Sequence, residues 1–111
     1  MLTEKDYCDY DTCVALEELG FPIRRIKVKG EEKHVPVLLY EAQKFLREEK
    51  KCFINIFFVA VDKWLWEIDI IYPNGTGRGK VIKLCKSYEE ALLEGVRASI
   101  KILQDEQKEN N

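Results

Sequence analysis

The 111-residue sequence contains a single histidine and no apolar run of 18 residues. Without such a run, no segment is long enough to cross a membrane as a helix. The first residues, Met1–Asp6, also lack the basic start and apolar stretch of a secretory signal. We therefore expect a cytoplasmic protein, whose four cysteines are thiols because that compartment is reducing.

Motifs for catalysis and for metal binding are absent as well. The glycine-rich stretch 75–80 has Asn74 and Val81 where a Walker A motif needs Gly and Ser or Thr. Cys8, Cys13 and His34 supply ligand types for zinc, but a second pair at the usual spacing is missing. We predict no catalytic residue, no metal ligand and no cofactor, and hence a protein that is not an enzyme.

The composition is typical of one folded domain. Apolar residues make up 46% of the chain and charged residues of both signs make up 34%. A chain of this length holds one core. We predict a single domain over residues 1–111, with the polar ends 1–8 and 105–111 loosely ordered.

Hydrophobic periodicity predicts an α+β fold with the order α-β-β-α-β-β-β-α. Helices are expected over 9–19, 37–50 and 88–104, and strands over 23–29, 32–35, 52–61, 64–72 and 80–85. We expect one antiparallel sheet of 4–5 strands with the helices packed mainly on one face. The strand 52–61 is apolar at both alternate sets of positions, which favours a central strand covered on both faces.

Several residues predict where helices begin, end and pack. Gly20 suits the end of the first helix, and Ser87 with Glu90 forms the capping-box pattern at the start of the last. Gly95 and Ser99 are small residues on the buried stripe of that helix. They would allow it to approach the sheet closely.

Trp64, Trp66 and Tyr72 alternate along one predicted strand and share a face. The favoured interpretation is that this face packs beneath the helices, since large aromatic residues dominate cores. The alternative is an open platform on which bases of single-stranded nucleic acid stack. The sequence pattern leaves both open.

Positive charge is concentrated in two segments. Residues 23–33 carry five bases against two acids, and residues 73–86 carry four bases and no acid, whereas both ends of the chain are acidic. If the segments met on one surface, they would form a contact site for nucleic acid or another anion. Its residues would be Arg24, Arg25, Lys27, Arg78 and Lys80. The favoured alternative is that acids within the fold, or solvent, neutralise these charges.

Five short motifs occur together in this chain. They are Glu18-Leu19-Gly20-Phe21, Pro36, Leu46-Arg47-Glu48, an aromatic hairpin and Ser87-Tyr88-Glu89-Glu90-Ala91. In this respect the chain resembles a group of small proteins from Bacteroides-type gut bacteria and their phages, over residues 10–104. The resemblance implies a shared fold and an origin in a phage or mobile element, and it implies no activity.

By elimination, the sequence favours a small non-catalytic accessory module that binds another protein. The alternative is a nucleic-acid-binding protein that uses the basic segments 24–33 and 78–86. A homodimer formed through an exposed strand edge is compatible with either function, and no membrane partner is expected.

Overall fold

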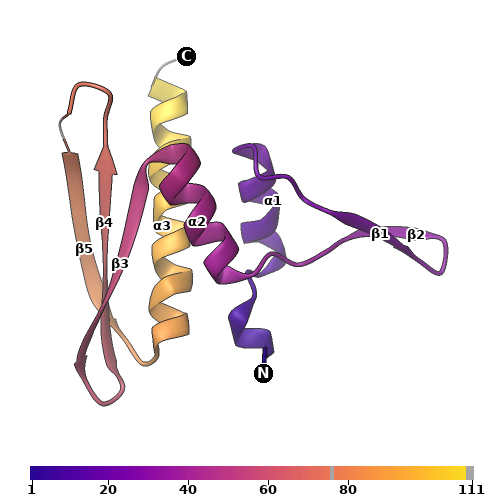
Figure 1. Ribbon diagram of the computed structural model, residues 1–111, viewed down its shortest axis with the longest axis horizontal. Helices are drawn as coiled ribbons and strands as arrows, with labels where there is room; N and C mark the ends of the chain where they lie inside the picture. Colours follow the sequence, from indigo (N-terminus) through magenta and orange to yellow (C-terminus); the bar gives the residue numbers. More distant parts are fainter. Residues whose placement is uncertain (76, 110–111) are drawn as a thin grey trace.

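The computed structural model describes residues 1–75 and 77–109, and of residues 78 and 80–83 only the backbone. The chain begins with a 3-10 turn, after which helices and strands follow in the predicted order (Figure 1). The α+β class is thereby confirmed. The elements are η1 (Glu4–Asp6), α1 (Tyr10–Glu18), β1 (Arg25–Val28), β2 (Glu31–His34), α2 (Leu39–Lys50), β3 (Cys52–Ala60), β4 (Lys63–Ile71), β5 (Gly77–Cys85) and α3 (Tyr88–Glu109).

The strands form two antiparallel sheets rather than the single sheet that we predicted. β3, β4 and β5 pair in that order, and β1 pairs only with β2. Every residue of β1 and β2 except His34 is exposed. Because these strands offer no sufficiently apolar face to the core, they leave the body as a separate hairpin, here called the arm (residues 25–34), which projects to one side (Figure 1).

The three-stranded sheet is covered on one face only. α2 and α3 pack on that face, and α1 lies behind them (Figure 1). Trp66 and Ile68 are buried beneath the helices and Trp64 is half-buried, so the expected core role of this aromatic face is confirmed. Within the described part of the chain, none of the helices combines the length and apolar character needed to cross a bilayer.

β3 is an edge strand, which corrects its predicted central place. β4 is the middle strand, and β5 occupies its other side. The first half of β3 is covered by α2 and α3, but from Phe57 to Ala60 every residue is exposed. The apolar residues in this second half are therefore not explained by burial in the core.

The helix ends largely follow the sequence pattern. Gly20 has φ +107°, a left-handed conformation that favours glycine, and the Phe21 amide donates to the Leu16 carbonyl at 3.0 Å. The Glu90 amide donates to Ser87 Oγ at 3.1 Å. The Glu90 carboxylate accepts from the Lys86 amide at 3.1 Å, one residue earlier than the capping box predicts.

Two small residues bring α3 against the sheet, as expected. Gly95 and Ser99 are both buried on its inner face. A Cβ atom on Gly95 would lie only 2.6 Å from Cγ2 of Ile54 in β3. The close approach of α3 to β3 therefore requires glycine, which has no side chain, at position 95.

The N-terminal segment packs against the body. Tyr7 forms an isolated antiparallel bridge with Leu38, and the amide of the buried Cys8 donates to the Val37 carbonyl at 2.8 Å. These contacts fix the N-terminal segment to the residues that lead into α2.

Candidate functional site

The structure does not bring the two basic segments together. Arg24, Arg25 and Lys27 lie at or near the arm, whereas β5 lies at the opposite side of the molecule, beyond the helices (Figure 1). The backbones of Arg78 and Lys80 pair with β4, but their side chains lie outside the described residues. The predicted five-residue surface is therefore divided, because the arm is not part of the main sheet.

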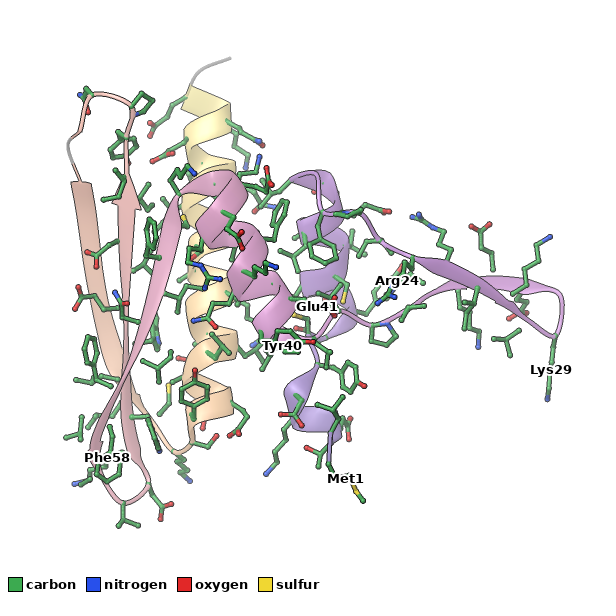
Figure 2. The ribbon with its side chains drawn as sticks, in the orientation of Figure 1. Met1, Arg24, Lys29, Tyr40, Glu41 and Phe58 are labelled. Carbon is green, nitrogen blue, oxygen red and sulfur yellow. The ribbon has the colours of Figure 1, made fainter. Side chains whose placement is uncertain are left out.

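Acids within the fold neutralise part of the arm. Arg25 forms ion pairs with Glu17 at 2.5 Å and with Glu32 at 3.7 Å. Arg24 and Lys27 are exposed and have no ion pair with any residue that the structure describes. The arm therefore keeps an exposed basic surface, with Lys29 at its tip (Figure 2).

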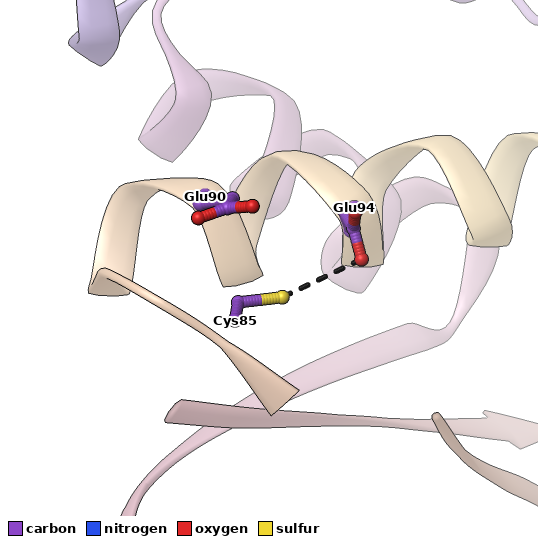
Figure 3. Close-up of side chains that lie close together, drawn as sticks. All are labelled: Cys85, Glu90 and Glu94. Atoms are coloured by element: carbon purple, nitrogen blue, oxygen red, sulfur yellow. Dashed lines mark hydrogen bonds between the residues drawn. The ribbon is translucent and has the colours of Figure 1, made fainter. Parts of the chain in front are cut away.

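A cluster of three potential metal ligands lies where β5 meets α3 (Figure 3). The ligand atoms of Cys85, Glu90 and Glu94 all lie within 4.8 Å of one another. Glu94 Oε2 accepts hydrogen bonds from Trp66 Nε1 at 3.3 Å and from Cys85 Sγ at 3.4 Å. The carboxylate thus satisfies a buried indole, which is a structural role. This cluster was not predicted from the sequence, where its signal is the i, i+4 spacing of two glutamates after a strand-end cysteine.

An open groove of about 820 Å³ lies between the N-terminal segment, the β2–α2 connection and the start of α3. Its volume is within the range of ligand sites. Burial raises the pKa of the Cys8 thiol in its wall to about 12, so this thiol is protonated and a poor nucleophile at neutral pH. The groove is large enough for a ligand, but the thiol in its wall is not activated for catalysis. Its lining is Glu4, Lys5, Tyr7, Cys8, Asp9, Val35, Pro36, Ser87, Glu89, Glu90 and Leu93.

Among the side chains that the structure describes, the longest run of exposed apolar ones lies at the β3–β4 turn and is here called the hairpin end (residues 57–61). The exposed fractions are 46% for Phe57, 63% for Phe58, 50% for Val59 and 80% for Val61. Figure 2 shows Phe58 beside this turn, at the opposite side of the molecule from the arm. Phe57 points to the open face of the sheet and Phe58 to the face that the helices cover, so apolar surface is exposed on both sides of this strand end. Single exposed apolar residues are ordinary, but a concentration of them marks an interaction surface.

Aromatic contacts extend this patch toward α3. The ring of Phe58 packs edge-on against Trp64, with centroids 5.2 Å apart. Trp64 in turn meets Tyr88 at 5.6 Å. Tyr88 is also exposed. The hairpin end therefore continues into a row of three aromatic rings, Phe58, Trp64 and Tyr88, of which Trp64 packs against the core.

Beside the hairpin end, the outer edge of β3 has no neighbouring strand among the residues that the structure describes. The Ile71 amide donates to the Lys51 carbonyl at 3.0 Å, so odd-numbered residues of β3 face β4. Even-numbered residues face the free edge, and Gln43 Nε2 donates to the outward carbonyl of Ile54 at 3.1 Å. By the same alternation, Ile56 and Phe58 direct their N–H and C=O groups outward, and Phe58 is the last residue before a shift in the register between β3 and β4. No hydrogen bond occupies them within the described part of the chain.

The open face of the sheet is polar at its centre. Asn55 Nδ2 donates to Asp69 Oδ2 at 3.1 Å. Desolvation and then the neighbouring Asp69 carboxylate raise the pKa of Glu67. This acidic centre separates the hairpin end from Ile71 at the far end of the same face.

No protein-family model, curated protein or solved structure matches this chain. The resemblance to the small proteins of Bacteroides-type bacteria and phages stays an expectation drawn from its motifs.

Proposed function

We propose that this protein is a non-catalytic protein-binding module and that the hairpin end is its docking surface. The observation that carries the proposal is the series of exposed apolar side chains from Phe57 to Val61 next to an unpaired strand edge. Extended segments bind such edges by adding a strand, with main-chain hydrogen bonds for affinity. The partner that suits this surface is an extended, uncharged, apolar protein segment.

Energetics support a partner of this kind. Burying one large apolar side chain completely is worth about 1.5–3 kcal/mol. Several partly exposed side chains in one patch can therefore offset part of the cost of association. The four buried thiols suit a reducing compartment, so a cytoplasmic location belongs to this proposal.

The test is affinity capture of the tagged protein from cell lysate, with and without nuclease, using two matched variants. Val59→Lys places a charge in the hairpin end. Ile26→Lys makes a similar change on the arm, at a side chain that is 52% exposed, close to the 50% of Val59. We expect a nuclease-resistant protein partner to be retained by the wild type and by Ile26→Lys and lost from Val59→Lys. Partners that vanish with nuclease, or that Val59→Lys retains, would contradict the proposal.

Nucleic-acid binding by the arm alone is the second candidate. It is favoured by one observation, the projection of an exposed basic ribbon from the body (Figure 1). A two-stranded β-ribbon fits the major groove of duplex DNA. This candidate predicts that binding weakens steeply as the salt concentration rises. Replacing Lys27 and Lys29 with alanine would make the slope of log K against log salt concentration shallower by about 1 for each phosphate that is no longer neutralised. Fluorescence anisotropy with a labelled duplex measures it, and equal slopes for the wild type and the variant would exclude the arm as the site.

A further inference from the structure

β3 and β5 are the outer strands of the three-stranded sheet, and only the sequence of β3 contains no charged residue. β5 carries Arg78, Lys80 and Lys83, whereas β3 contains no charged residue between Cys52 and Ala60. Charged side chains on an edge strand oppose pairing with another copy of the same strand. Pairing of two β3 strands therefore brings no like charges together within the strand.

The geometry of the β3 edge restricts the register of such a pairing. Gln43 already occupies the outward carbonyl of Ile54, which leaves Ile56 and Phe58 as the next outward-facing residues. In an antiparallel pair of identical strands, Ile56 of each copy can stand opposite Phe58 of the other. Each such pair then exchanges two backbone hydrogen bonds.

This register places Phe57 on the two-fold axis, directly opposite Phe57 of the second copy. The two residues form a non-hydrogen-bonded pair, in which side chains approach most closely. The ring of Phe57 is about half exposed and lies on the open face of the sheet with Leu65, its partner in β4. An aromatic pair across the axis would shield both rings from water.

We propose that two copies of this chain associate through their β3 edges, with Ile56 opposite Phe58 and Phe57 opposite Phe57, to form a continuous six-stranded antiparallel sheet. The inference rests on the proposed function, because the same hairpin end supplies the surface, and it names a second copy as the partner. A two-fold interface of this type is closed and does not propagate into fibres. It also removes an apolar edge that would otherwise favour aggregation.

The first experiment measures the mass of the purified chain by light scattering and sedimentation over a range of concentrations. We expect a reversible shift from the 13.0 kDa of one chain to twice that mass. Phe57→Lys sets two like charges opposite each other and should weaken dimerisation about tenfold or more. The matched control is Ile71→Lys, because Ile71 lies on the same face with 45% exposure, against 46% for Phe57, and should dimerise like the wild type.

The second experiment tests the register directly. In the Phe57→Cys variant, oxidation by copper phenanthroline should join the introduced thiols of two copies in a disulfide, while the four native thiols are buried. Ile71→Cys should not cross-link, because position 71 lies far from the axis. Circular dichroism of each variant confirms that the fold is kept.

A chain that stays monomeric at every soluble concentration would overturn the inference. A dimer that Phe57→Lys leaves intact, or that fails to cross-link in Phe57→Cys, would also overturn it, because the copies would then meet elsewhere. These results are separable from the proposed function. A monomeric chain that still loses its captured partner in Val59→Lys would keep the docking surface and reject the second copy.

Discussion

Replacing Gly95 with alanine is expected to lower the free energy of unfolding by about 1–3 kcal/mol, the usual cost of overpacking a core. The added Cβ would lie 2.6 Å from Cγ2 of Ile54, which is too close for van der Waals contact. In an exposed helix the same change is stabilising by about 1 kcal/mol, because alanine is the better helix former. Urea denaturation followed by circular dichroism measures the change in the free energy of unfolding. The steric clash predicts a decrease, whereas helix preference alone predicts an increase.

A double-mutant cycle identifies the contact responsible. Ile54→Leu removes the Cγ2 branch while keeping the volume of the side chain, so Gly95→Ala should cost less in that background than in the wild type. Gln107→Ala, at an exposed position of the same helix, is the control and should change stability little. An increase in stability for Gly95→Ala would show that α3 does not approach β3 as described.

Stability is also expected to fall steeply above pH 9. Burial raises the pKa of Cys8 to about 12 and that of Cys52 to about 11, from an ordinary value of 9.0. The unfolded chain therefore loses these protons first, so the contribution is complete below pH 9 and is lost as the pH rises toward 11–12. Each thiol contributes a slope of about 1.4 kcal/mol per pH unit in this range, for a loss of about 4 kcal/mol from Cys8 and about 3 kcal/mol from Cys52. The total is comparable with the stability of a typical domain.

Urea denaturation between pH 8 and pH 10.5 measures this slope. Other ionisable groups also change charge in this range, so the wild type is compared with Cys8→Ala and Cys52→Ala. In each variant the free energy of unfolding should fall less steeply with pH than in the wild type. Alanine is preferred to serine because a buried hydroxyl that lacks a hydrogen-bond partner would itself lower the stability. Equal slopes in the wild type and both variants would mean that the thiols are accessible to water in the folded state, and rapid reaction with a thiol reagent at neutral pH would show the same.

Local features of the fold were predictable from the sequence. The order of helices and strands, the end of α1 at Gly20 and the start of α3 at Ser87 follow from short patterns that involve neighbouring residues. The role of Gly95 was also predicted, since a small residue on a buried stripe indicates that the helix packs closely there. The element order and the two helix ends depend on interactions between neighbouring residues. For Gly95, the pattern of one helix predicted the close approach but not that Ile54 would be its partner.

Non-local features were not predictable. An apolar strand such as β3 has the same sequence pattern whether it lies at the centre of a sheet or at an edge with an exposed end. The pattern of β1 and β2 similarly does not say whether they join the main sheet or leave it. Both outcomes depend on which strands pair across the fold, and that choice sets the hairpin end apart from the arm.

The arm also bears on how such a protein can change over time. Its strands contribute no residue to the buried core, and its base is held by α1 and by the segment that leads into α2. Substitutions or insertions in the arm therefore act on its length and charge with little effect on the stability of the body. Changes in the arm therefore leave the hairpin end, at the opposite side of the molecule (Figure 2), untouched, so the two surfaces are free to evolve independently.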